Sequence, residues 1–464
     1  MFDLLERVLK KTDCFTEIRY HNRELNSISV RKGELEESSS SIYGGVGIRV
    51  LIKGSWGFSS TNRLTENDIY KTFKEAKIAA EISSKNKKVK VKGLSETTMA
   101  VGEFEPEIND SLKNHSLDEK LSLVLKTEKL MRASSPLIQS AFCRYNEIID
   151  EKYIVTSDGA RCHILDMKPE FRLMAVAVRE VDMTSAFKAI GVTGGWEDIF
   201  GKKKPEELAE STAKIAIDLL DAKYPIGERL TVILDPSLVG ILSHEAIGHT
   251  VEADFVLAGS ISQGKIGKKV ASELITLVDS GPSQIKKHAG GELLVDDEGV
   301  PTKKTIIIKD GILMSYLHNR ETSKIFDVEP TGNARAFEYS DEPLIRMRNT
   351  YIEPGNHELG DMISEIKKGY LLKGPMSGQA DANAEFMFGV QEAYEINNGK
   401  LGRLLKGATI SGQAFDVLNS VDSVSKDFEW DLGSGYCGKK QYAKVDAGGP
   451  YLRCKLIIGG KQER

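Results

Sequence analysis

Residues 230–249, with the sequence LTVILDPSLVGILSHEAIGH, contain the features that decide how the central part of this chain folds. The apolar run 230–234 predicts a strand, and the Asp-Pro pair that follows is typical of a helix N-cap with proline in the first turn. Apolar residues at helical spacing then continue the pattern. We therefore predict a helix that emerges directly from a strand and carries both His244 and His249.

The two histidines belong to an HExxxH motif, which is one residue longer than the familiar HExxH zinc motif. Two imidazoles supply neutral nitrogen ligands that suit zinc, and the neighbouring carboxylate of Glu245 can accept a proton from water that the metal activates. The alternative is that His244 and His249 serve only packing and capping, with Glu245 solvated. The motif favours the zinc site.

The spacing of the histidines has a geometric consequence. On a regular helix, positions i and i+5 lie about 140° apart, against about 40° for i and i+4. A single π-turn of about 4.4 residues would bring the pair to within about 50°. Gly248 tolerates unusual backbone angles and stands where such a bulge or a helix end is needed. We therefore predict a local bulge or a helix end near Gly248.

A catalytic zinc site with an open position has three protein ligands, so one more ligand is expected. Glu252 is the local candidate, because it would project about 80° from His244 on a regular helix, between the two histidine directions. Cys437, in the glycine-rich segment GSGYCGK, is the distant candidate. Cys454 is the third, although its alternation with apolar neighbours is typical of a buried strand face. Spacing alone does not rank Glu252 below Cys437.

Composition limits the classes of function. The chain has 464 residues, a net charge of −5 and dispersed basic residues, so no nucleic-acid-binding surface is indicated. The basic run 85–92 has no aromatic residue to stack on a base. Five cysteines without a CxxC pair indicate reduced thiols and a cytoplasmic protein. Neither a signal peptide nor a run of roughly 18 to 20 apolar residues is apparent, so no membrane association is expected.

The pattern of elements predicts an α+β fold, with an N-terminal α/β region of antiparallel strands and helices and a sheet-rich C-terminal domain that carries the zinc-binding helix. We place the N-terminal region at residues 1–225, with a sub-boundary near 85–115, and the C-terminal domain at 226–464. The expected helices cover residues 2–12, 65–83, 117–133 and 205–222. The expected strands cover residues 17–20, 25–31, 45–52, 55–60, 138–146, 148–156, 161–167, 171–181, 230–234, 305–308, 312–318, 346–352, 385–388, 391–397 and 407–410.

The whole chain resembles the TldD/PmbA family, peptidases once described as modulators of DNA gyrase, and in particular the TldD-type subunit that retains the metal motif. HEAIGHTVEADF, at residues 244–255, is similar to the family signature HEAxGHxxEAD. Further segments follow in the family's order: VDDEG (295–299), DGILMSYLHNRETS (310–323), TGNARA (331–336), RMRNTYIEPG (346–355), KGATISG (406–412) and CGKKQ (437–441).

The resemblance implies that His244, His249 and Cys437 bind one zinc ion per catalytic chain, with Glu245 as the catalytic base. Glu252 then orients an imidazole instead of binding the metal. Family members commonly have CGKxGQ, whereas this chain has CGKKQ and lacks the glycine before the glutamine, which leaves the conformation of this loop open. Because a thiolate ligand makes zinc a weaker Lewis acid, additional oxyanion donors are expected, and the candidates are His318, Arg320, Tyr339 and Arg346.

The implied function is zinc-dependent hydrolysis of unfolded or short peptides, bound in extended form as an added strand. The resemblance also implies a dimer, either with a PmbA-type subunit that lacks the motif or with a second copy of the chain. Three alternatives stay open. They are a zinc amidase or deformylase-like hydrolase of a small substrate, a non-catalytic regulatory or scaffold subunit, and a zinc ion that only joins two parts of the domain.

Overall fold

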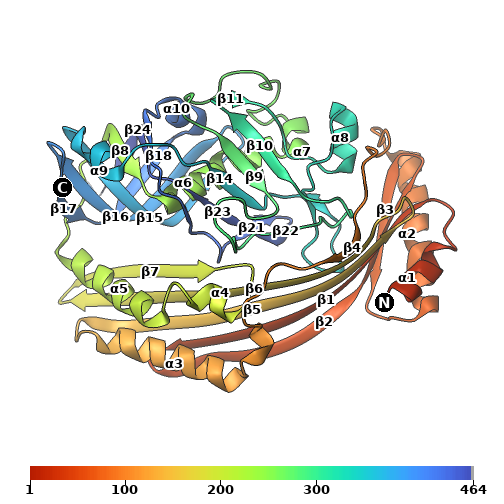
Figure 1. Cartoon of the computed structure of the whole chain (residues 1–464), viewed down its shortest axis with the longest axis horizontal. Helices are drawn as coiled ribbons and strands as arrows, with labels where there is room; N and C mark the ends of the chain where they lie inside the picture. The colour runs from red at the N-terminus through yellow and green to blue at the C-terminus, as the bar shows by residue number, and fades with distance from the viewer. Residues whose placement is uncertain (461–464) are drawn as a thin grey trace.

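A long, curved sheet forms one layer of the molecule and lies beneath the C-terminal part of the chain (Figure 1). The computed structural model describes residues 1–460. The order of the strands in this sheet is β3-β2-β1-β5-β6-β4, and β7 pairs with β6. The strands are β1 (Phe15–Arg31), β2 (Glu34–Ile52), β3 (Ser55–Thr61), β4 (Val101–Phe104), β5 (Ile138–Thr156), β6 (Arg161–Arg179) and β7 (Asp182–Gly191).

Helices pack on the face of this sheet that is turned away from the C-terminal part (Figure 1). One apolar cluster joins α1 and α2 to β1, β2 and β5, and a second joins α3 and α5 to β1, β5, β6 and β7. Ser116 and Glu119 form a capping box at the start of α3, which satisfies backbone donors at the helix N-terminus. The helices are α1 (Phe2–Leu9), α2 (Glu66–Asn86), α3 (Leu117–Ala133), α4 (Trp196–Phe200) and α5 (Pro205–Asp218).

The opposite face of the sheet carries buried charged residues. Arg19 donates two hydrogen bonds to the carbonyls of Glu338 and Asp341, and Arg49 donates to Glu298 at 2.7 Å. These charges interrupt the apolar alternation. The sequence therefore predicted two short strands in place of each long one: 17–20 and 25–31, 138–146 and 148–156, and 161–167 and 171–181. That prediction was wrong, because β1, β5 and β6 are each continuous. A strand that packs against charged partners does not need an alternating apolar pattern.

Two larger sheets and several short strands make up the C-terminal part. One sheet has the order β15-β8-β24-β18-β16-β17, with β19 beside β24, and the other has the order β11-β10-β9-β14-β23-β20. Their strands are β8 (Glu228–Leu234), β9 (Leu277–Ser280), β10 (Lys304–Lys309), β11 (Ile312–Leu313), β14 (Asn349–Ile352), β15 (Lys368–Ala380), β16 (Glu385–Asn397), β17 (Lys400–Leu405), β18 (Ala408–Gln413), β19 (Ser423–Val424), β20 (Glu429–Trp430), β23 (Asp446–Gly449) and β24 (Leu452–Gly459).

Two short hairpins, five short α-helices, a π-helix (Leu242–Gly248) and a 3₁₀ helix (His249–Val251) complete the described residues of this part. The strands of the hairpins are β12 (Ala334–Arg335), β13 (Leu344–Ile345), β21 (Tyr436–Lys439) and β22 (Gln441–Lys444). The α-helices are α6 (Pro236–Ile241), α7 (Ala253–Leu257), α8 (Arg320–Phe326), α9 (Leu359–Ser364) and α10 (Ala414–Asn419). Among residues 1–460, no helix is both long and apolar enough to cross a membrane.

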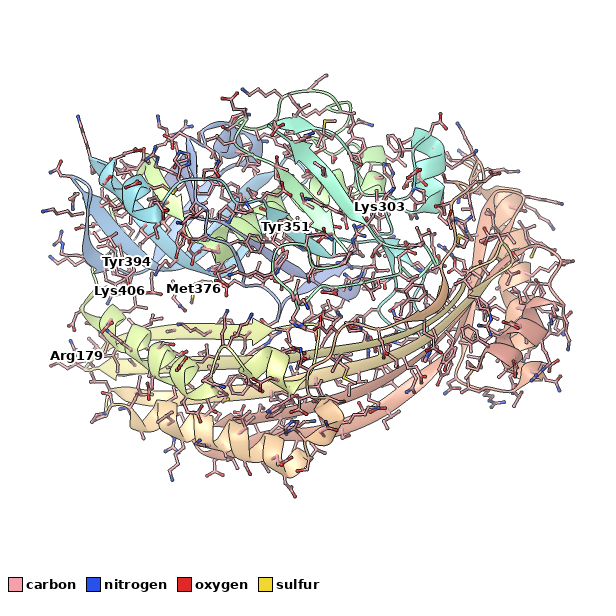
Figure 2. The ribbon with its side chains drawn as sticks, viewed as in Figure 1. Arg179, Lys303, Tyr351, Met376, Tyr394 and Lys406 are labelled. Carbon is pink, nitrogen blue, oxygen red and sulfur yellow. The ribbon has the colours of Figure 1, made fainter. Side chains whose placement is uncertain are left out.

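The largest apolar cluster fills the space between the two larger sheets. It contains residues of α6, such as Leu238 and Val239, together with Leu277 of β9 and Phe388 of β16. Side chains such as Tyr351 of β14 also lie inside this part of the molecule (Figure 2). The helix that follows β8 is therefore enclosed by strands of both sheets, which fixes its position.

Several expectations for the C-terminal part need correction. The strand predicted at 312–318 is limited to β11, because the chain then leaves the sheet and Leu317 makes only an isolated bridge to Glu252. β15 was not predicted, because it contains three glycines and a proline that are typical of loops. In the first sheet, β7 was not predicted either. The division of the chain at residue 225 stays a proposal. The α+β fold class is confirmed.

Candidate metal centre

The helix that carries the two histidines changes its hydrogen-bonding pattern just before them. Asp235 accepts a hydrogen bond from the Leu238 amide at 2.9 Å and caps α6, as its Asp-Pro sequence predicted. From Leu242 to Gly248 the backbone is a π-helix, and the His249 amide donates to the His244 carbonyl. A bond from i+5 to i is the π-type bond that the spacing of the motif requires. The predicted local bulge is confirmed.

Gly248 is needed for close packing and not for unusual backbone angles. Its φ and ψ are −53° and −49°, which are ordinary helical values. A Cβ atom at this position would lie 1.9 Å from Sδ of the buried Met347 side chain, so that side chain would have to move. The expectation of special backbone angles was therefore wrong, and the small size of glycine is what the site requires.

The structure brings His244, His249 and Cys437 together. One ligand atom from each residue lies within 4.8 Å of those of the other two. Sγ of Cys437 is 3.1 Å from Nε2 of His249, and the imidazole centroids are 5.4 Å apart. His244 and Cys437 are each 4% exposed. Two histidines of one helix and a cysteine from a distant part of the sequence thus converge on one small, mostly buried volume.

These donors fit a metal ion. Both ring nitrogens of His244 are buried and have no hydrogen-bond partner among the described residues. Buried polar atoms are normally hydrogen-bonded, so such an orphaned imidazole indicates a missing partner. A thiolate with two imidazoles is a donor set that suits zinc. The donor set leaves room for a fourth ligand.

Without a metal ion, the charges within the cluster favour an ion pair between a thiolate at Cys437 and a protonated imidazole at His249, whose proton a metal ion would displace. Burial alone would raise the pKa of the Cys437 thiol, but His244 and His249 lower this pKa to about 5. Burial alone would lower the pKa of His249, but Cys437 and Glu252 raise it to about 10. The sulfur is therefore held as a thiolate, which is the form that ligates metals.

Glu245 lies at the more open side of the cluster. Its side chain is 33% exposed, and Oε2 is 3.8 Å from Nε2 of His249. It follows His244 directly, so the π-helix turns its carboxylate away from the apolar core that contains Ala246 and Ile247. A carboxylate in this position can reach a water or substrate beside the three donors.

Glu252 contacts the side of the His249 ring that faces away from Cys437. It is fully buried, and Oε2 is 3.0 Å from Nδ1 of His249, the ring nitrogen opposite the one that faces Cys437. Lys439 donates to the same oxygen at 3.3 Å, and Arg346 Nε is 3.9 Å from the other oxygen. These contacts fix the tautomer of His249, leaving Nε2 directed at the cluster.

We expect Glu252→Gln to weaken metal binding about 10- to 100-fold, because the hydrogen bond that orients His249 and increases its basicity is weakened. Competition with a chromophoric chelator measures the dissociation constant. Asp254→Asn is the matched control, since Asp254 also binds Lys439, at 2.7 Å, but makes no contact with a histidine nitrogen. Equal losses in the two variants would contradict this role of Glu252.

A hairpin of β21 and β22 supplies the cysteine. Cys437 is paired with Ala443, and Lys440 stands at the tip with a φ of +60°. Arg346 donates to the carbonyls of Cys437 at 2.7 Å and Gln441 at 2.8 Å, so it holds both strands of the hairpin. The segment CGKKQ therefore forms the loop without the family's glycine, and Lys440 adopts the left-handed conformation that glycine adopts more easily.

Other candidates from the sequence do not join the cluster. Cys454 is buried in β24, opposite Val232 of β8. Of the four candidate oxyanion donors, only Arg346 contacts the cluster, through the carbonyl of Cys437. The other three have partners elsewhere: His318 pairs with Thr322, and Arg320 binds Asp158 and Glu298. Tyr339 packs against Gly45 and Gly47.

Sequence reasoning missed the contacts of Lys439. This residue lies two positions after Cys437 in the same strand, so both side chains project from the same face of β21. It binds Glu252 and Asp254, and its ammonium group lies 4.2 Å from the ring centroid of Phe255. The acidic pair in the segment VEAD was the available signal, because a buried acidic residue requires a cationic partner.

The chain is thus an α+β protein with a cluster of two histidines and a cysteine at a π-helix. This chain belongs to the TldD/PmbA family: the models described as PmbA/TldA metallopeptidase domain 1, central domain and C-terminal domain match residues 16–80, 110–220 and 227–460, respectively.

Similar proteins extend over the whole chain. It is 36% identical to a metalloprotease of Methanocaldococcus jannaschii, over 97% of each chain. It is 32% identical to the zinc metalloprotease TldD homolog of Saccharolobus solfataricus, over 99% of this chain and 100% of that protein. The crystal structure of TldE from Thermococcus kodakarensis shares the fold, with a TM-score of 0.79, 20% identity and coverage of 98% of this chain and 100% of that one.

Proposed function

We propose that this chain is a zinc-dependent peptidase that hydrolyses unfolded or short peptides, with His244, His249 and Cys437 as the zinc ligands and Glu245 as the general base. The observation that carries the proposal is the convergence of the three donors, with both nitrogens of His244 unpartnered, beside the half-exposed carboxylate of Glu245. The names of the relatives from M. jannaschii and S. solfataricus support the same activity.

The residues around the site have separate roles in hydrolysis. Zinc supplies Lewis-acid chemistry at such a site, polarising a carbonyl and acidifying water. Glu245 accepts the proton of the attacking water and hands it to the leaving amine. Glu252 holds His249 in one tautomer, and Arg346 keeps Cys437 in place through its carbonyl.

We expect removal of the metal to abolish peptide hydrolysis, and stoichiometric zinc to restore it. The measurement is cleavage of an unfolded protein and of a short fluorogenic peptide, before and after dialysis against a chelator. A small amide serves as a third substrate, because cleavage of this amide alone would favour an amidase. Peptide cleavage that persists in protein shown to be free of metal would contradict the proposal.

We also infer that the chain works as a dimer, with a PmbA-type subunit lacking the motif or with a second copy of itself. The shared fold with TldE from T. kodakarensis supports a partner built on the same architecture. Light scattering of the chain alone, and of the chain mixed with such a subunit, distinguishes a homodimer from a heterodimer. A monomer under both conditions would sink this inference.

A further inference from the structure

A small polar cavity lies between the charged face of the first sheet and the hairpin that carries Cys437. Its volume is about 40 Å³, and its wall contains residues of β1, β5, β6, β12 and β22. Five of the lining side chains are cationic and three are carboxylates. The wall therefore carries more positive than negative groups.

Most of the charges in this wall are already paired. Three cations each bind one carboxylate at N–O distances of 2.7 to 3.0 Å: Arg23 with Asp150, Lys152 with Asp297, and Lys168 with Asp166. Lys444 is 3.4 Å from Glu170, which also binds Arg172 at 2.8 Å. Within the described part of the chain, Arg335 has no carboxylate within 4.0 Å, so it is the one cation of this wall without a direct ion pair, although Asp297 and Asp166 act on it from further away.

Arg335 is nevertheless buried, with only 8% of its surface exposed. Its one hydrogen bond among the described residues runs from Nη1 to the Met347 carbonyl at 2.7 Å. Burial, together with repulsion from Arg346, lowers the pKa of Arg335 to about 10, and the carboxylates of Asp297, Asp166 and Asp279 offset only part of this shift. Nη1 of Arg23, which is 5% exposed, also lacks a hydrogen-bond partner. A buried guanidinium without a counterion is destabilising, so an anion would stabilise this arrangement.

The cavity has the size of a compact oxyanion. At about 10–15 Å³ for each enclosed water, it holds roughly three, which is the space that a carboxylate or a phosphate group needs. The planar fork of an arginine matches the oxygens of either group. We propose that this cavity binds a compact oxyanion through Arg335, and that during peptide hydrolysis the oxyanion is the terminal carboxylate of the substrate.

Two short connections join the cavity to the candidate metal centre. Met347, whose carbonyl binds Arg335, also packs its sulfur against Gly248 between the two histidines. Ala443, which lines the cavity, is the cross-strand partner of Cys437. If a chain end is anchored in this cavity, we expect cleavage close to the carboxyl terminus. The carboxylate assignment rests on the proposed peptidase function, whereas the oxyanion site does not.

The kinetic test compares two peptides of one sequence, one ending in a free carboxylate and the other in an amide. A charge-assisted hydrogen bond predicts a KM about 10- to 100-fold lower for the free acid in the wild-type enzyme. Arg335→Met removes this preference, Arg335→Lys restores part of it, and Arg403→Met, an exposed position on β17, leaves it unchanged. Equal KM values for the two peptides in the wild type overturn the carboxylate assignment, whatever the variants do.

A binding test separates the oxyanion site from the activity. We expect inorganic phosphate to raise the melting temperature of the wild type and of Arg403→Met, but not of Arg335→Met. Calorimetry with Glu245→Gln measures the affinity for both peptides without turnover. A phosphate effect with equal peptide affinities retains the oxyanion site and rejects the substrate carboxylate as its ligand. Absence of both effects in the wild type overturns the whole inference, whereas selective binding without cleavage rejects only the peptidase function.

Discussion

Replacing Glu245 with glutamine is expected to reduce peptide hydrolysis about 100- to 10,000-fold, the range that a positioned general base contributes. Glutamine keeps the shape of the side chain but cannot accept the proton of the attacking water. Because the carboxylate lies beside the donor cluster and outside it, the metal should remain bound. Steady-state kinetics together with metal analysis of the same preparation measures both quantities.

The control for this variant is Glu273→Gln, which makes the same chemical change at an exposed position in the loop before β9. It should retain full activity and full metal content. If Glu245→Gln keeps wild-type turnover with its metal bound, then Glu245 is not the base. A site of this kind would then have a structural role, joining the hairpin to the helix.

Replacing Cys437 with serine is expected to remove the metal and with it the activity. The serine hydroxyl is not ionised at neutral pH, whereas the cysteine is held as a thiolate by the two imidazoles. The loss in metal affinity should exceed the roughly 100-fold upper range for a residue that only orients a ligand. Mass spectrometry under native conditions measures how much zinc each protein molecule retains.

Cys454→Ser provides a matched comparison, because Cys454 is also buried and lies in a strand of the same part of the chain. Both variants place a hydroxyl in a buried position, so both are expected to lose stability. Only Cys437→Ser should lose zinc. Similar zinc contents in the two variants would exclude Cys437 as a ligand.

The sequence predicted the helix of the site well because its constraints are local. The Asp-Pro cap, the apolar spacing and the separation of His244 from His249 together required a π-turn, and the backbone has one. The role of Gly248 was not predictable in the same way. Its reason is Met347, which lies about one hundred residues further along the chain and reaches it only in the folded structure.

The long strands and the supporting contacts of the site were harder to predict. β1 carries Arg19 and Arg23 on a face that is buried against charged groups, so its pattern is that of two short strands and a polar loop. The cavity around Arg335 was not predictable for the same reason, because its wall includes residues of five strands that are distant in sequence. The third donor also comes from a distant hairpin, and spacing within the helix did not distinguish Cys437 from Glu252.

X-ray absorption spectroscopy at the zinc edge tests the proposed metal centre most directly. For the zinc-loaded wild-type protein, we predict one sulfur at about 2.3 Å and two imidazole nitrogens at about 2.0–2.1 Å, with any remaining ligand a light atom. The sulfur contribution should disappear from any zinc that Cys437→Ser retains and should persist in Cys454→Ser. A first shell of nitrogen and oxygen alone in the wild type would contradict the assignment of His244, His249 and Cys437 as the ligands.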